Sequence, residues 1–110
     1  MALPTAAVAQ DGQVVFNNAC RTCHTMKPGD NRLGPTLAGI IGRKAGTADG
    51  YNNYSSAMTG SGVIWDEATL DKFIESPDIV IPGNNMKPFA GITSKEDRQK
   101  IVTFLKADGN

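Results

Sequence analysis

The sequence predicts an all-α domain in which roughly half of the chain is irregular. Two stretches space their apolar residues as one face of a helix does, and no stretch alternates with the period of two that marks a strand. The 110 residues include 12 Gly and 6 Pro, which predict many tight turns. A chain of this length forms one small domain. So much loop in a small domain indicates that a bound group organises the fold.

The first half of the chain is expected to hold only short helical segments. Residues 12–19 contain an apolar cluster and are predicted to form a helix that runs into Cys20. Residues 25–50 are interrupted by Gly and Pro throughout, so a long loop is expected there. Residues 55–59 have room for one helical turn.

The second half contains two stronger helix candidates. Residues 66–76 place three apolar side chains on one face and end before Pro77, because a residue that precedes proline avoids the helical conformation. Residues 77–92 are predicted to be loop. The last helix is predicted to start at a capping box, with Thr93 as N-cap and Glu96 at the third helical position, and it carries Ile101, Val102, Phe104 and Leu105.

Charge and hydropathy exclude several classes of protein. Eleven basic and eleven acidic side chains cancel, so the chain lacks the basic field that nucleic-acid binding requires. An apolar content of 40% is that of a globular chain rather than a disordered one. No apolar run approaches the ~18 residues of a membrane-spanning helix.

The first nine residues differ in composition from the rest. They are mostly small and apolar, and Ala7-Val8-Ala9 has the A-x-A pattern of a signal-peptide cleavage site. We interpret residues 1–9 as a signal-peptide remnant or a flexible tail, and residues 10–110 as the single functional domain.

The organising group is indicated by Cys20-Arg21-Thr22-Cys23-His24. C-x-x-C-H is the attachment signature of c-type haem, in which two thiols form thioethers with the porphyrin and the next residue brings an imidazole to the iron. A thioredoxin-like redox pair would need a βαβ surrounding, which the sequence lacks. A plain disulfide would leave the loop-rich remainder unexplained. His24 is the only histidine of the chain, so it is the candidate metal ligand.

A sixth iron ligand must come from elsewhere, or that position stays open. An open position would indicate gas binding or peroxidase chemistry, whereas a methionine would favour electron transfer. Met86 lies in a loop stiffened by two prolines, and Met58 could equally be a core residue. The full set of methionines is Met1, Met26, Met58 and Met86.

From Asp11 to Gly109 the chain resembles the class I cytochromes c, specifically the short mitochondrial type and its soluble bacterial relatives. The resemblance implies the cytochrome c fold, with short helices and long loops around one covalently bound haem. The motifs that carry it beyond C-x-x-C-H are Gly34-Pro35-Thr36-Leu37, Gly42-Arg43-Lys44, Gly50-Tyr51 with Tyr54, Trp65, Ile81-Pro82-Gly83 with Met86, Phe89-Ala90-Gly91 and Phe104-Leu105-Lys106.

At matching positions the resemblance assigns roles around the haem. It makes His24 and Met86 the axial ligands, with the carbonyl of Pro35 accepting from the imidazole. The residues that it places against an inner haem propionate are Arg43, Tyr54 and Trp65, since a buried carboxylate needs donors. The residues that it places along the haem crevice are Leu37, Leu70, Ile74, Phe89 and Leu105.

The resemblance also implies contacts within the fold, and three positions depart from it. Gly12 and Phe16 would cross Ile101 and Phe104. Phe73 stands where a tyrosine donor to the ligand sulfur is frequent, and Asn84 stands where threonine is usual. Lys87 and Pro88 lengthen the stretch between Met86 and Phe89 by one residue.

The implied function is that of a soluble, monomeric one-electron carrier rather than an enzyme. The resemblance suggests a membrane cytochrome bc complex as donor and a terminal oxidase or photosynthetic reaction centre as acceptor. A bacterial periplasm is expected, with the mitochondrial intermembrane space as the alternative. The alternative function is a haem ligand-binding or peroxidase-like protein with an open sixth position. Only Lys27 and Lys87 are expected to contribute basic charge near the docking face.

Overall fold

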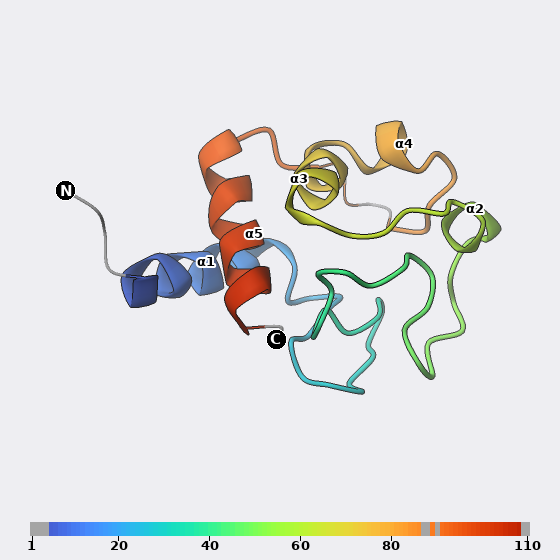
Figure 1. Cartoon of the computed structure of the whole chain (residues 1–110), viewed down its shortest axis with the longest axis horizontal. Coiled ribbons are helices and arrows are strands. Elements are labelled where there is room, and N and C mark those ends of the chain that lie inside the picture. The colour runs from blue at the N-terminus through green and yellow to red at the C-terminus, as the bar shows by residue number, and fades with distance from the viewer. Residues whose placement is uncertain (1–4, 87–88, 90, 109–110) are drawn as a thin grey trace.

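The computed structural model describes residues 5–86, 89 and 91–108, with side chains for residues 12–86, 89 and 91–107. Within these ranges the helices are α1 (Thr5–Ala19), α2 (Ser56–Thr59), α3 (Glu67–Glu75), α4 (Pro77–Val80) and α5 (Lys95–Asp108). The same residues form no β-strand, although an isolated antiparallel bridge pairs Lys44 with Ile64. The all-α class with extensive loops is therefore confirmed (Figure 1).

The helices α1 and α5 cross each other at close range, and α3 packs against α5 (Figure 1). A Cβ atom at Gly12 would lie only 2.3 Å from the carbonyl oxygen of Lys100 and 2.6 Å from Cβ of Phe104, so this position accepts no side chain. The rings of Phe16 and Phe104 lie 5.2 Å apart, and Ile101 is completely buried beside them. The contact expected between residues 12 and 16 and the last helix is present.

Helix α3 matches the predicted segment, and a capping box at its N-terminus fixes where the helix begins. The Oδ1 atom of Asp66 accepts from the backbone N–H of Thr69 at 2.8 Å, and Oγ1 of Thr69 accepts from the backbone N–H of Asp66 at 2.8 Å. This reciprocal pair satisfies two amides that the first turn leaves without helical partners. The apolar face of α3 is buried and consists of Leu70, Phe73 and Ile74.

Helix α2 confirms the single turn expected near residues 55–59, but the loop expected over residues 77–92 is wrong at its start. Residues 77–80 form the short helix α4, with Pro77 in its first turn. Proline is well tolerated there because the first helical amide has no acceptor within the helix. The proline that ends α3 therefore begins α4.

The predicted N-cap of α5 is wrong by one residue. The helix begins at Lys95, and Oγ of Ser94 accepts from the backbone N–H of Asp97 at 3.2 Å, so Ser94 is the N-cap rather than Thr93. The carbonyl of Thr93 instead accepts from Nη1 of Arg98 at 2.9 Å. Arg98 is buried and also donates from Nε to Oδ1 of Asp71 at 2.9 Å, which ties the start of α5 to α3.

Helix α1 begins earlier than expected, at Thr5 rather than near residue 12, so residues 5–9 of the expected tail are helical. The division into a processed segment and a domain remains a prediction. No helix in the described ranges combines the length and apolar character needed to cross a membrane.

Candidate functional site

The C-x-x-C-H motif extends α1 by one further turn. The backbone N–H of Cys20 donates to the carbonyl of Phe16 at 2.7 Å, and the N–H of His24 donates to the carbonyl of Cys20 at 2.9 Å. Cys20 and Cys23 are half-buried, and neither is in a disulfide. Burial, and then the neighbouring Cys23, raise the pKa of the Cys20 thiol to about 11. Two thiols therefore lie one helical turn apart, immediately before the histidine.

The imidazole of His24 is buried and oriented by one hydrogen bond. Its Nδ1 atom lies 2.8 Å from the carbonyl oxygen of Pro35, as expected. Because a carbonyl only accepts, Nδ1 must carry the proton, and Nε2 is left with its lone pair. Burial lowers the pKa of His24, the bond to Pro35 opposes this, and the charge of Arg43 lowers it further. The ring is therefore neutral at pH 7, which is the state that binds a metal.

The loop that supplies Pro35 runs against the face of this imidazole. A Cβ atom at Gly34 would lie 2.3 Å from Cε1 of His24, so only glycine lets the backbone pass there. Gly34 is also anchored through its N–H to the carbonyl of Cys23 at 2.7 Å. The motif and the Gly34-Pro35 segment thus form one unit that fixes the ring.

The predicted group of Arg43, Tyr54 and Trp65 lies where the loop of residues 36–49 meets the segment of residues 54–65, which contains α2. The hydroxyl of Tyr54 accepts from the backbone N–H of Ala48 at 3.1 Å. The backbone N–H of Trp65 donates to the carbonyl of Arg43 at 3.0 Å. The buried Trp65 ring meets the ring of Phe73 edge-on, with 5.0 Å between the ring centroids. Phe73 thus occupies the core beside Trp65.

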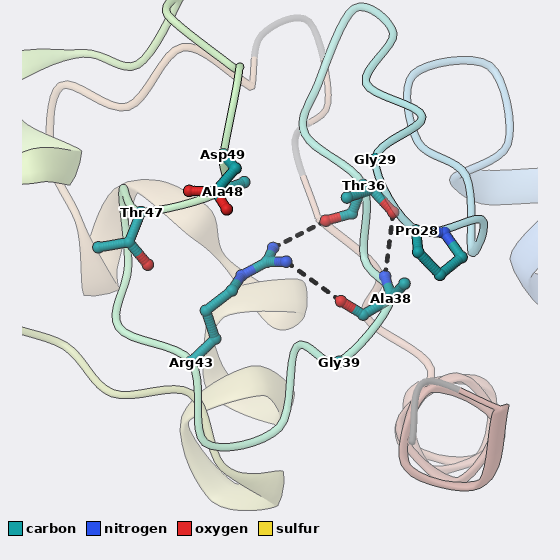
Figure 2. Close-up of a pocket in the computed structure, with 9 residues that line it drawn as sticks. All are labelled: Pro28, Gly29, Thr36, Ala38, Gly39, Arg43, Thr47, Ala48 and Asp49. Atoms are coloured by element: carbon teal, nitrogen blue, oxygen red, sulfur yellow. Dashed lines mark hydrogen bonds between the residues drawn. The ribbon is translucent and has the colours of Figure 1, made fainter.

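Arg43 bonds to the loop in front of it rather than standing in solvent. Its Nη2 donates to the carbonyl of Thr36 at 2.8 Å and its Nη1 to that of Ala38 at 3.2 Å (Figure 2). Burial lowers the pKa of this guanidinium, and Tyr54 opposes the effect. The guanidinium borders an open cavity of about 450 Å³, whose lining is Pro28, Gly29, Thr36, Ala38, Gly39, Arg43, Thr47, Ala48 and Asp49.

Met86 lies at the end of a loop that side chains organise. It is half-buried against the core, and its backbone N–H donates to Oδ1 of Asn84 at 2.9 Å. The N–H of Phe89, also half-buried, donates to the carbonyl of Met86 at 2.9 Å. Lys87 and Pro88, to which the longer loop and part of the docking face were assigned, lie outside the described residues.

The other methionines of the described chain occupy different surroundings. Met58 is buried within α2, where its N–H donates to Oγ of the N-cap Ser55 at 3.1 Å. Met26 is half-buried two residues after His24 and packs against the core. Met1 lies outside the described residues. Among the described residues, one methionine therefore lies on an irregular loop distant in sequence from His24, and that residue is Met86.

Sequence reasoning missed the polar side chains that hold these loops together. Oδ1 of Asn31 accepts from the N–H of Thr36 at 2.9 Å, and its Nδ2 donates to the carbonyl of Asp49 at 3.0 Å. The hydroxyl of Tyr51 donates to the carbonyl of Leu33 at 2.8 Å. Their partners are backbone atoms, whose positions no residue pattern shows. The buried, polar character of Asn84 was likewise not visible in the sequence.

The donor set fits a thioether-linked haem. Two unpaired thiols lie one helical turn apart, and the histidine that follows presents a neutral imidazole with its second nitrogen free to bind. The fold and this site define a small protein of the class that binds haem through a C-x-x-C-H motif.

Comparisons with known proteins identify the family. The Cytochrome c family model matches residues 9–107. The chain is 45% identical over 87 residues to "Cytochrome c2 iso-2" of Magnetospirillum molischianum, a match that covers 79% of this chain and 88% of that protein. It is 39% identical to "Cytochrome c" of Euglena viridis, over 89% of this chain and 94% of the relative.

The structure agrees with these matches. The solved structure of cytochrome cH from Methylobacterium extorquens superposes with a TM-score of 0.81 at 38% identity, covering 90% of this chain and 97% of the other. The chain belongs to the cytochrome c family. Members of this family are electron carriers rather than enzymes, and the protein carries one covalently bound haem c with its iron.

Proposed function

We propose that the protein is a soluble, monomeric one-electron carrier whose haem iron is ligated by His24 and Met86. The observation that carries the proposal is the hydrogen bond of 2.8 Å between Nδ1 of His24 and the carbonyl of Pro35. This bond fixes the tautomer and the ring plane, as second partners of metal-binding histidines do. The bond leaves Nε2 with its lone pair, which is the form of the ring that binds a metal.

The bound haem iron supplies a one-electron couple between Fe(III) and Fe(II). Around it, Cys20 and Cys23 tether the group, and the rigid Gly34–Pro35 segment keeps the imidazole in one orientation. Met86 offers a soft thioether, which suits an electron carrier and raises the potential. Because the backbone N–H of Met86 is held by the buried side chain of Asn84, the ligands stay in place in both oxidation states, which keeps reorganisation small.

Three further residues are proposed to hold the inner haem propionate. Arg43, Tyr54 and Trp65 supply donors in one partly buried region, and the hydroxyl proton of Tyr54 is not used in its bond from Ala48. A guanidinium there offsets a carboxylate charge that would otherwise be costly to bury. Phe89 is proposed to cover the haem near Met86.

The proposed partners follow the family. We propose a membrane cytochrome bc complex as donor and a terminal oxidase or photosynthetic reaction centre as acceptor, in a bacterial periplasm; the "Cytochrome c2" names of several relatives support this setting. The net charge is zero, so charge steering contributes little. Electron-transfer rates with these partners are expected to depend only weakly on ionic strength, with exposed Lys27 and with Lys87 as the basic contacts.

Absorption spectroscopy of single variants tests the ligand assignment. Met86→Ala should keep the haem covalently attached but abolish the methionine–iron charge-transfer band of the oxidised protein. Met58→Ala is the matched control and should keep that band. Loss of the band in Met58→Ala, with retention in Met86→Ala, would contradict the assignment. Absence of the band from the unsubstituted protein would favour the open-site alternative, a ligand-binding or peroxidase-like haem protein.

A further inference from the structure

Asn84 is the buried polar centre of the loop that carries Met86. The residue is only 5% exposed, and its side chain makes three hydrogen bonds. Nδ2 donates to Oδ1 of Asp78 at 3.1 Å and to the carbonyl of Ile81 at 2.9 Å. Oδ1 accepts from the backbone N–H of Met86 at 2.9 Å. A buried carboxamide with three hydrogen bonds holds the groups that it bonds to in fixed positions.

Donation runs in one direction, from the N–H of Met86 to Asn84 and from Asn84 to Asp78 in α4. The carboxylate of Asp78 accepts from the amide group, which polarises the carboxamide and strengthens its oxygen as an acceptor for the N–H of Met86. We propose that Asn84 is the positioning residue for Met86, and that Asp78 acts on Met86 through it. This inference rests on the proposed ligation by Met86 and adds which residues keep that ligand bound.

The neighbouring Asn85 supplies a contrast within the same loop. It is exposed, and its Nδ2 donates to the carbonyl of Asn53 at 3.1 Å. Water can replace that bond when Asn85 is shortened, whereas removing the side chain of Asn84 leaves the buried Ile81 carbonyl and the Met86 amide short of partners. Asn84 is buried and bonded to Met86, whereas Asn85 is exposed and bonded elsewhere, so Asn85→Ala is a matched control for Asn84→Ala.

Competition by added imidazole measures how firmly Met86 is held. An exogenous ligand binds only when the methionine has left the iron, so its apparent affinity rises with the fraction of open loop. Asn84→Ala holoprotein should bind imidazole about tenfold more tightly than the unsubstituted protein, and Asn85→Ala should stay within about twofold of it. A shift in Asn84→Ala no larger than that in Asn85→Ala would overturn the proposal.

Two further variants keep the test decisive if Asn84→Ala does not fold. Asn84→Thr retains a hydroxyl that can accept from Met86 and donate to Ile81, so imidazole binding should remain within about threefold of the unsubstituted protein. Asp78→Ala removes an exposed carboxylate and should tighten imidazole binding about threefold. The methionine–iron charge-transfer band of this variant should weaken at temperatures well below that at which the protein unfolds. Imidazole binding by Asp78→Ala as weak as that of the unsubstituted protein would overturn the proposal that Asp78 acts on Met86 through Asn84.

Met86→Ala in the same assay separates this inference from the proposed ligation. If Met86→Ala binds imidazole much more tightly while Asn84→Ala does not, the positioning role is wrong and the ligation stands. If Met86→Ala binds imidazole no more tightly than the unsubstituted protein, Met86 is not the ligand, and both proposals fail.

Discussion

The two halves of the molecule satisfy their backbone in different ways. In the helical half, made of α1, α3 and α5, the amides bond locally along each helix and the side chains contribute apolar contact. In the loop half, residues 20–66, irregular backbone–backbone bonds are supplemented by polar side chains from distant positions, as between Asn31 and Asp49 or Tyr51 and Leu33. The half that holds most of the site is therefore the one that depends on single hydrogen bonds.

This contrast predicts different responses to substitution. Substitutions that crowd the helix contacts should lower the free energy of unfolding strongly and change the haem surroundings little. Loop substitutions should cost less stability but alter the haem surroundings. The following changes test that division, beginning with the largest expected effect.

The helix crossing should be the most sensitive point. Gly12→Ala inserts a methyl group 2.3 Å from the carbonyl oxygen of Lys100, and a backbone atom cannot rotate away. We expect a loss of about 3 kcal/mol in the free energy of unfolding, measured by denaturant titration of the holoprotein, with the reduction potential unchanged. Exposed Gln13→Ala is the control and should change stability by less than about 0.5 kcal/mol. A Gly12→Ala protein as stable as this control would refute the close crossing.

Arg43 should affect both stability and potential. Arg43→Ala leaves the carbonyls of Thr36 and Ala38 without their donors, at a cost of about 2 kcal/mol. It should also lower the reduction potential, because a cation near the haem disfavours Fe(III). Arg43→Lys keeps the charge but loses the forked geometry, so it should lose stability while keeping most of the potential. Equal potentials in all three proteins, measured by redox titration, would place Arg43 outside the haem environment.

Asn31 should stabilise the loop half alone. Asn31→Ala removes the bridge between Thr36 and Asp49, and we expect a loss of about 1.5 kcal/mol. Native-state hydrogen exchange of the Thr36 amide should accelerate, while that of Ile101 in α5 changes only with global stability. Exposed Asn52→Ala serves as the control. Equal acceleration at both amides would show that the two halves do not open separately.

Tyr51 should give the smallest effect. Tyr51→Phe removes the bond to the carbonyl of Leu33 and should cost about 0.7 kcal/mol. Burial raises the pKa of Tyr51 above its ordinary value of 10.0, so the folded state holds this proton more tightly than the unfolded chain does. The contribution of the protonated Tyr51 hydroxyl to the free energy of unfolding is complete below pH 10, and it is lost as pH rises through the folded-state pKa of Tyr51. Denaturant titrations across this range should show a shallower alkaline loss in Tyr51→Phe; an identical slope would contradict this role.

The same contrast explains what the sequence could predict. The apolar spacing of Leu70, Phe73 and Ile74, followed by Pro77, located α3, because helical bonds are local and leave a periodic pattern. The cap of α5 was misplaced by one residue because Thr93 and Ser94 can both cap. In the structure Ser94 accepts from the N–H of Asp97, and the carbonyl of Thr93 accepts from Arg98.

The site was predictable to the extent that its residues form motifs. The spacing of Cys20, Cys23 and His24 indicates haem attachment directly, and the resemblance supplied the bond from His24 to Pro35. Asn31 and Asn84 were missed as organising residues because their partners are mostly backbone atoms brought close by the fold. A residue pattern identifies what can bind, but not which loop atoms a lone amide will meet.

Proton NMR of the reduced holoprotein tests the central claim, ligation of the iron by Met86, most directly. A methyl group held over the face of an aromatic macrocycle is strongly shielded. We predict one methionine methyl resonance shifted far upfield, present in the Met26→Ala and Met58→Ala proteins and absent from Met86→Ala. An upfield methyl that persists in Met86→Ala, or the absence of any such resonance from the unsubstituted protein, would contradict the claim.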